Sequence, residues 1–330
     1  METDNKAINI ICPTKFGSLN YLGSLMKQIL KDHKVAVSDK YEPKAHNMLI
    51  DVTVSDRYNP NAHNILIGEG VTSAVYKRRA DVWWTDTPAI IYRSKEEIKK
   101  ILETENLFKK HYTVSEFCKE IYREQNIPVE DTVIPRPVNP ILFNYRTRYE
   151  ECEYDIAFIG YLCTADRKNV NPSIATVLKN QIKSVFVTNA LIPKRPFITK
   201  YSFGSITDEQ KAQILSKSKF LLFPSSIEGF GLPPLEAMSA GCVPIYSDVP
   251  AHNEFATGIP IKPHDKIKTF AYGCRIIKYV ITKEDIEEAV KYALGIGKEE
   301  YEDLQSKCIE RAKYMYSLFK QRLNSLIEVN

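Results

Sequence analysis

Residues 219–241, KFLLFPSSIEGFGLPPLEAMSAG, constrain the fold more than any other part of the sequence. An apolar run is followed by a Gly-x-Gly turn, and a helical stretch then begins with two prolines in its first turn and ends at Gly241. A strand, a loop and a helix in this order form the unit from which α/β domains are built. Backbone N–H groups at such a helix start have no partner within the helix, so the segment predicts a site for an anion such as phosphate.

The same alternation of strand and helix begins at the start of the chain. An apolar run at residues 8–12 is followed by a loop that contains Gly17 and by a helical pattern over residues 19–29. Short runs rich in β-formers then continue to residue 92, and helical stretches follow them. Alternating elements of this kind favour a mostly parallel sheet covered by helices.

A proline-rich stretch separates this first half from a second one. Residues 127–145 contain four prolines and no helical periodicity, which is typical of a short strand followed by an extended linker. The alternation restarts with a strand at residues 155–160. We therefore expect an α/β protein of two domains, residues 1–145 and 146–330. The long helical pattern at the end of the chain either crosses back to the first domain or lies on the second.

The composition agrees with a globular protein of two domains. A chain of 330 residues with 44% hydrophobic and 26% charged residues can bury two cores. The formal net charge of +4 suits an anionic ligand but is too small for a dedicated nucleic-acid binder. No basic segment followed by a long apolar run opens the sequence, and no stretch has the apolar length of a membrane span. We therefore expect a cytoplasmic protein whose scattered cysteines are reduced.

Two glutamates bracket the Gly-x-Gly turn. Glu228 lies in the turn and Glu236 lies near the start of the helix that follows. Both are expected at the carboxyl end of the sheet, where open α/β sheets bind ligands. Carboxylates at this edge suit the hydroxyl groups of a sugar. The alternative for Glu236 is a carboxylate that only stabilises the helix dipole, and a Gly-x-Gly turn alone is weak evidence.

The segment EGFGLPPLEAMSAG resembles the E-x7-E signature of family 4 glycosyltransferases, the retaining "glycosyl transferases group 1" type. The resemblance implies a GT-B architecture, with two facing Rossmann-like domains and the active site in the cleft between them. It implies transfer of a sugar from a nucleotide-sugar donor with retention at the anomeric carbon, and neither a bound metal nor another cofactor. Glu228 would then lie against the donor sugar and Glu236 would hold the ribose. Backbone amides would bind the donor at Gly229, Phe230, Gly231 and Leu232.

Weaker matches to the family extend over the chain. Phe203-Gly204-Ser205-Ile206 resembles the segment that lines the nucleotide base, so Ser205 is a candidate donor-binding residue, or part of a buried β-turn that needs no ligand. Gly17 stands at the place of the amino-terminal glycine-rich loop, or is an ordinary turn glycine. Asp86 falls where many relatives have a histidine near the donor sugar, and it competes with a simple cap of a turn or helix.

The largest departure from the family follows Gly160. Relatives usually have arginine directly after this glycine and lysine some residues later, and both grip the diphosphate. Tyr161 replaces that arginine, whereas Lys168 fits the lysine. We expect the neighbouring Arg167 to take over the vacant role. The alternative is that Arg167 and Lys168 are solvated loop residues.

Several questions stay open at this point. The donor base and sugar are not specified, and the acceptor is a glycan, a lipid, a protein or a nucleic acid. His46 and His63 occupy equivalent places in a repeat of 17 residues, and they either belong to a duplicated loop and strand or contact the acceptor. Lys99 and Lys100 either meet a membrane surface or form a solvated helix face. A sugar-nucleotide 2-epimerase and a non-catalytic binding relic of the same fold are the rival functions.

Overall fold

The computed structural model describes both halves of the chain. The described residues are 7–11, 25–26, 28–30, 35–38, 62–69, 82–86, 91–92, 109–144, 147–163, 166–271 and 274–327. Two compact units result: Met1–Pro137 together with Leu318–Asn330, and Val138–Ser317. The division falls after Pro137, whereas the sequence predicts a boundary after residue 145.

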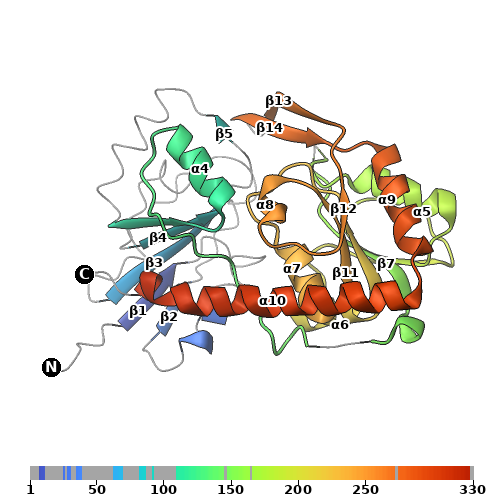
Figure 1. Ribbon diagram of the computed structural model, residues 1–330, viewed down its shortest axis with the longest axis horizontal. Coiled ribbons are helices and arrows are strands. Elements are labelled where there is room, and N and C mark those ends of the chain that lie inside the picture. Colours follow the sequence, from blue (N-terminus) through green and yellow to red (C-terminus); the bar gives the residue numbers. More distant parts are fainter. Residues whose placement is uncertain are drawn as a thin grey trace. The chain divides into compact units, whose positions relative to one another are not determined.

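A parallel sheet forms the centre of the described part of the first unit (Figure 1). Its strands run in the order β2-β1-β3-β4-β6, and every pair in it is parallel. The strands of this unit are β1 (Ala7–Ile11), β2 (Val35–Ser38), β3 (Ala62–Glu69), β4 (Val82–Asp86), β5 (Ile91–Tyr92) and β6 (Lys110–Thr113). Helix α4 (Glu116–Glu124) begins at Ser115, whose hydroxyl accepts a hydrogen bond from the backbone of Cys118. This cap satisfies one of the free N–H groups at the helix start.

The second unit also contains a parallel sheet, whose strands run in the order β12-β11-β10-β7-β8-β9. Its strands are β7 (Tyr154–Ile159), β8 (Ser184–Val187), β9 (Ile198–Tyr201), β10 (Ser218–Phe223), β11 (Val243–Ser247) and β12 (Ile259–Ile261). Its helices are η4 (Tyr149–Glu151), α5 (Val170–Asn180), α6 (Asp208–Ser216), α7 (Leu232–Ala240), α8 (Pro250–Asn253), α9 (Lys283–Gly295) and the start of α10 (Lys298–Ile327). An antiparallel hairpin joins β13 (Asp265–Ala271) to β14 (Cys274–Val280).

The strand order of the second sheet reverses between β7 and β10. The chain proceeds from β7 to β8 and β9 on one side, and it then returns to add β10, β11 and β12 on the other side. Loops that leave two strands at such a reversal point diverge, and the crevice at their carboxyl ends is where open α/β sheets bind ligands. A ligand-binding site is therefore expected at the loops after Ile159 and Phe223.

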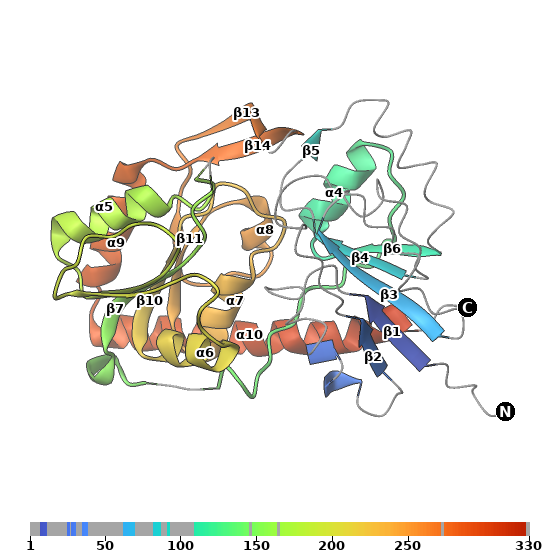
Figure 2. The same ribbon diagram turned by 180° about the vertical axis from the view of Figure 1, so that it is seen from behind.

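Helix α10 closes the described chain as one helix of 30 residues (Figure 2). The part before Leu318 belongs to the second unit, where the hydroxyl of buried Tyr301 donates to the carbonyl of Lys219 (3.1 Å). The part from Leu318 onward belongs to the first unit, where Phe319 stacks on Trp84 with ring centroids 5.9 Å apart. Within the residues that the structure describes, no helix combines the length and the apolar character that a membrane span requires.

Candidate functional site

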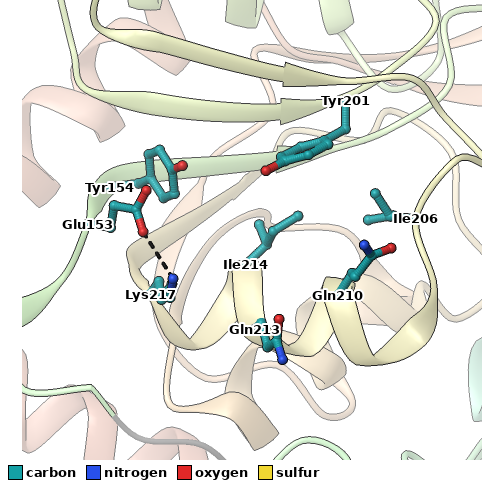
Figure 3. Close-up of a pocket in the computed structure, with 8 residues that line it drawn as sticks. All are labelled: Glu153, Tyr154, Tyr201, Ile206, Gln210, Gln213, Ile214 and Lys217. Carbon is teal, nitrogen blue, oxygen red and sulfur yellow. Dashed lines mark hydrogen bonds and ion pairs between the residues drawn. The ribbon is translucent and has the colours of Figure 1, made fainter.

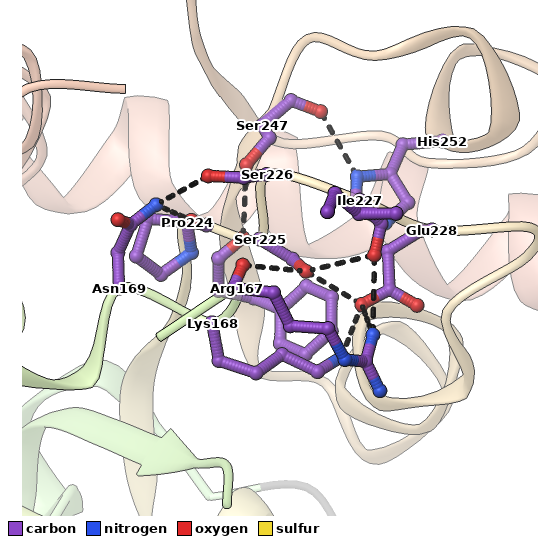
Figure 4. A network of polar contacts seen from close by, with 11 residues as sticks. Arg167, Lys168, Asn169, Pro224, Ser225, Ser226, Ile227, Glu228, Ser247 and His252 are labelled. Carbon is purple, nitrogen blue, oxygen red and sulfur yellow. Dashed lines mark hydrogen bonds and ion pairs between the residues drawn. The ribbon is translucent and has the colours of Figure 1, made fainter. Parts of the chain in front are cut away.

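The loops after β7 and β10 are joined by a set of buried hydrogen bonds (Figure 4). The side chain of Asn169 donates to the carbonyl of Pro224 (2.6 Å) and to the hydroxyl of Ser226 (2.9 Å). In the reverse direction, the backbone N–H of Ser226 donates to the carbonyl of Arg167 (2.7 Å). These bonds fix the residues after β7 against the start of the signature segment, so side chains from both loops meet at the reversal point of the sheet.

Glu228 is the centre of this meeting point. Its Oε1 accepts hydrogen bonds from Ser225 Oγ (2.6 Å), from Arg167 Nη1 (3.3 Å) and from Lys168 Nζ. Burial alone would raise the pKa of this carboxyl group, since its side chain is only 7% exposed. The charges of Lys168 and Arg167 outweigh burial and hold the pKa at about 2. Glu228 is therefore ionised near neutral pH and acts as an acceptor rather than as a proton donor.

The two cations beside Glu228 are themselves fixed. Arg167 Nη1 also donates to the backbone carbonyl of Ile227 (3.1 Å), and Lys168 Nζ lies 4.3 Å from the ring centroid of Phe223. Their side chains are 28% and 14% exposed. The sequence left open whether they are solvated loop residues, and the structure answers that they belong to a partly buried ion cluster. Two cations thus contact one glutamate in this cluster.

The signature helix starts directly after this cluster. Gly231 is the N-cap of α7 with φ of +87°, a left-handed conformation that L side chains rarely adopt. A Cβ atom at this position would lie 2.7 Å from Nε2 of His252. Both the backbone conformation and this close contact therefore disfavour a side chain here. Phe230 was a candidate donor-binding residue, but its ring is buried and stacks on Phe255 with centroids 4.5 Å apart. Only its backbone is suited to contact a ligand.

His252 is a residue that the sequence analysis missed. It lies on α8, it is fully buried, and its Nδ1 is 2.9 Å from the carbonyl oxygen of Ser247. Because a carbonyl oxygen only accepts, Nδ1 carries the hydrogen and Nε2 faces Gly231. Burial lowers the pKa of His252, although the nearby charge of Glu228 opposes this shift. It follows β11 by a short loop, and the pairing of β11 with β10 brings it to the edge of the sheet that carries Glu228.

Glu236 has a different environment, on the second turn of α7. Its side chain is 3% exposed, and its Oε1 accepts a hydrogen bond from Lys211 Nζ on α6 (2.7 Å). The same Nζ lies 3.0 Å from Oδ1 of Asp208. Burial raises the pKa of Glu236, and the charge of Lys211 limits that rise. Lys211 was also missed, because nothing in the sequence distinguishes it from the many lysines on helix surfaces.

The remaining candidates lie apart from these two clusters or outside the described residues. Ser205 closes a turn after β9 in which its hydroxyl donates to the carbonyl of Ser202 (2.7 Å), and the turn is exposed rather than buried. Tyr161 is 51% exposed and meets the ring of Phe203 edge to face at 5.5 Å. Asp86 is the last residue of β4, but its side chain is not among the described ones. Gly17 and His46 lie outside the described residues, and of His63 only the place in β3 is described.

A cavity of about 160 Å³ lies between α6 and the sheet of the second unit (Figure 3). Tyr154, Tyr201, Gln210 and Lys217 are among the residues that line it, and Lys217 pairs with Glu153 (3.2 Å). Its lining contains none of the residues that contact Glu228 or Glu236. Since Tyr154 is the first residue of β7 and Glu153 precedes it, part of the cavity lies away from the carboxyl ends of the strands. The two glutamate clusters therefore define the candidate site.

Comparisons with known proteins agree with this geometry. Residues 201–314 match the model of the family described as Glycosyl transferases group 1. The chain is 27% identical over 261 residues to "Putative glycosyltransferase ORF330" of Acidianus filamentous virus 2, which covers 72% of this chain and 76% of that protein. It is 26% identical over 251 residues to "Putative glycosyltransferase 48" of Sulfolobus islandicus filamentous virus, with 73% and 74% covered.

Solved structures extend the similarity to the whole fold. Sucrose-phosphate synthase from Thermosynechococcus elongatus matches with a TM-score of 0.67 at 14% identity, over 97% of this chain and 98% of that one. Anabaena HepE in complex with UDP-glucose matches with a TM-score of 0.65 at 12% identity, over 97% and 99%. The fold is thus GT-B, the α/β class of two Rossmann-like domains that the signature predicts. The match to the glycosyl transferases group 1 model covers residues 201–314, and the resemblance to family 4 that the signature predicts is confirmed.

Proposed function

We propose that this protein is a retaining hexosyltransferase that moves a sugar from a nucleotide-sugar donor to an acceptor hydroxyl. The observation that carries the proposal is the buried Glu228 carboxylate, held by Arg167 and Lys168 beside the start of α7. One ionised acceptor and two cations at a helix start suit a ligand with both hydroxyl groups and a diphosphate. HepE, with the same fold, has been solved with UDP-glucose.

The charges in the cluster match the charges that develop during transfer. When the bond between the anomeric carbon and the phosphate oxygen breaks, its electron pair stays on the diphosphate and the sugar ring becomes positive. Lys168, Arg167 and the amides of residues 229–232 then stabilise the departing diphosphate, and ionised Glu228 stabilises the sugar. The acceptor oxygen forms the new bond on the face that the leaving group occupied, and its proton passes to the departing phosphate. The products are the glycosylated acceptor and the free nucleoside diphosphate.

The pKa of Glu228 supports this assignment of roles. A carboxyl group with a pKa near 2 cannot protonate a leaving group at neutral pH, so Glu228 does not act as the general acid of a glycosidase. In the structure both cations contact Glu228. An incoming diphosphate would be a second anion for the same two cations to bind. Glu236 is assigned to the ribose hydroxyls, the first unit to the acceptor, and the second unit to the donor.

A donor screen followed by a turnover assay tests the proposal. Binding of UDP-, GDP- and ADP-sugars is measured by thermal shift, and release of the nucleoside diphosphate is then measured with and without a mixture of glycan, lipid, protein and nucleic-acid acceptors. We expect one donor to raise the Tm and its turnover to depend on an acceptor and on Glu228, tested with Glu228→Gln. Chelation with EDTA leaves turnover unchanged, because the cations of the cluster meet the diphosphate without a metal.

Other outcomes of the same assay contradict the proposal in distinct ways. Conversion of the donor sugar to its 2-epimer without acceptor would identify an epimerase. If the protein binds a donor but glycosylates no class of acceptor, it is a non-catalytic binding protein. Activity lost in EDTA and restored by Mn²⁺ would show that the two cations are not sufficient.

A further inference from the structure

Lys211 connects two carboxylates that belong to different helices. Its Nζ lies 2.7 Å from Oε1 of Glu236 on α7 and 3.0 Å from Oδ1 of Asp208 on its own helix α6. The same Nζ lies 5.6 Å from the ring centroid of buried Phe143. Among these groups the Lys211 side chain is 18% exposed, whereas Glu236 is 3% exposed. The lysine therefore lies between Glu236 and the surface of the second unit.

The start of α6 holds Lys211 in this place. Thr207 caps the helix: its hydroxyl accepts from the backbone of Gln210 (3.2 Å), and the Gln210 side chain accepts in return from the backbone of Thr207 (2.8 Å). The backbone N–H of Lys211 then donates to the carbonyl of Thr207 (2.9 Å). A reciprocal cap of this kind fixes the first turn of a helix. The lysine thus reaches Glu236 from a rigid backbone position.

The chemistry of Glu236 depends on this lysine. A carboxylate can accept two hydrogen bonds from neighbouring hydroxyl groups only while it is ionised and correctly turned, and burial works against the ionised form. Asp208 adds a second negative charge nearby, which opposes the approach of an anionic ligand. One cation between the two carboxylates counteracts both effects.

We propose that Lys211 is a positioning residue for the donor nucleotide, which holds Glu236 as an oriented, ionised acceptor for the ribose hydroxyls and reduces the repulsion between the two carboxylates and the diphosphate. This inference rests on the proposed function, because it takes a nucleotide as the ligand of Glu236. The competing explanation is a pair that only packs α6 against α7. A buried ion pair is weak evidence for stability, so the two explanations need an experiment that separates them.

The experiment compares the variants Lys211→Met and Lys211→Arg with the wild-type chain. Kd values for UDP, GDP and ADP are measured by calorimetry, and the nucleotide that the wild type binds best is then followed from about pH 5.5 to about pH 8.5. We expect Lys211→Met to weaken binding about tenfold at neutral pH, and Lys211→Arg about threefold or less. The ratio of the Lys211→Met Kd to the wild-type Kd is expected to grow as the pH falls, because Glu236 without its cation takes up a proton more readily. Titration of the phosphates cancels in this ratio.

Lys217→Met is the matched control. Lys217 follows the same helix, its side chain is 55% exposed, and it forms an ion pair with Glu153 that does not involve Glu236. Its loss should leave nucleotide affinity unchanged. If Lys211→Met does not fold, Lys211→Gln removes the same charge and retains a polar side chain for the test.

The possible outcomes separate this inference from the proposed function. If Glu236→Gln weakens nucleotide binding while Lys211→Met binds within twofold of the wild type, the role of Lys211 is overturned and the donor site stands. A pH-independent ratio together with a lowered Tm would reduce Lys211 to a packing residue. If the wild-type chain binds none of the three nucleotides, the proposed function fails and this inference fails with it.

Discussion

Glu228 and Glu236 belong to one sequence signature, are both buried, and have pKa values that move in opposite directions. Two cations from the loop after β7 contact Glu228, and its pKa falls to about 2. Glu236 has one cation, Lys211, which also serves Asp208, and its pKa is raised. Burial opposes ionisation in both cases, so the neighbouring charges decide the result: two cations lower the pKa of Glu228, whereas at Glu236 the negative charge of Asp208 adds to the effect of burial. Glu228 is ionised near neutral pH, whereas Lys211 is the cation that favours the ionised form of Glu236 among the described residues.

The largest effect is expected from separating the roles of the two glutamates. Glu228→Gln removes the charge at the reacting sugar, and we expect kcat to fall by about 10² to 10³ with little change in nucleotide affinity. Glu236→Gln should instead weaken nucleotide binding about tenfold, because the ribose is distant from the breaking bond. Steady-state kinetics and calorimetry distinguish the two. If both substitutions change kcat, or both change nucleotide affinity, to the same extent, the two glutamates do not have the separate roles proposed here.

The stability of the chain at low pH tests the difference in pKa directly. A carboxyl group with a folded pKa of about 2 and an unfolded pKa near 4.5 stabilises the fold above the unfolded value, and this stability is lost as the pH falls toward 2. The shift corresponds to about 3 kcal/mol in the free energy of unfolding. Urea unfolding between about pH 6 and about pH 3 should therefore show a smaller acid-induced loss in Glu228→Gln than in the wild type.

Glu236→Gln is the control for that measurement. Because the pKa of Glu236 is raised, protonation of this group favours the folded state as the pH falls, and its replacement should not remove the acid-induced loss. If Glu228→Gln and the wild type lose the same free energy of unfolding as the pH falls, the low pKa of Glu228 is contradicted.

Arg167 offers a test of intermediate size. Its Nη1 donates to Ile227 and to Glu228, so Arg167→Ala should loosen the loop and remove one cation from the diphosphate. We expect turnover to fall about 30-fold, and about threefold to tenfold in Arg167→Lys, which retains the charge without the planar fork. Lys168→Ala provides the comparison. Near wild-type turnover in Arg167→Ala, with loss in Lys168→Ala, would assign the role to the lysine alone.

The smallest expected effect concerns the glycine between the two glutamates. Gly231→Ala forces a Cβ atom into a left-handed backbone conformation and against His252, and we expect a loss of about 1 to 2 kcal/mol in stability. Combining it with His252→Ala removes the contact but not the backbone strain. A double-mutant cycle by urea unfolding should therefore show a coupling of about 1 kcal/mol. Additive effects would mean that the loop shifts to avoid the histidine.

Much of the candidate site was readable from local sequence. The strand, the Gly-x-Gly turn, the prolines and Gly241 define β10, the loop and α7, because each acts on the backbone at its own position. The E-x7-E spacing identified both glutamates and, through the family, Lys168. Arg167 was inferred from charge alone, and the structure brings it to Glu228, although its role toward a diphosphate stays a prediction.

Two residues could not be found in this way. Lys211 precedes Glu236 by 25 residues, and its side chain meets that carboxylate only because α6 packs against α7. His252 reaches Gly231 because β11 lies next to β10, so that α8 starts at the same edge of the sheet. Neither residue has a distinctive neighbour in the sequence. Strand order and helix packing, which are set by contacts between distant segments, decided their positions.

The sequence by itself determined the strand, turn and helix of the signature, the resemblance to the family and the identity of the two glutamates, because turns, caps and periodicity depend on neighbouring residues. Only the tertiary structure decided the chemical state of those glutamates. Their pKa values depend on burial and on the distance to cations from other loops and helices, and both quantities exist only after the strands have taken the order β12-β11-β10-β7-β8-β9.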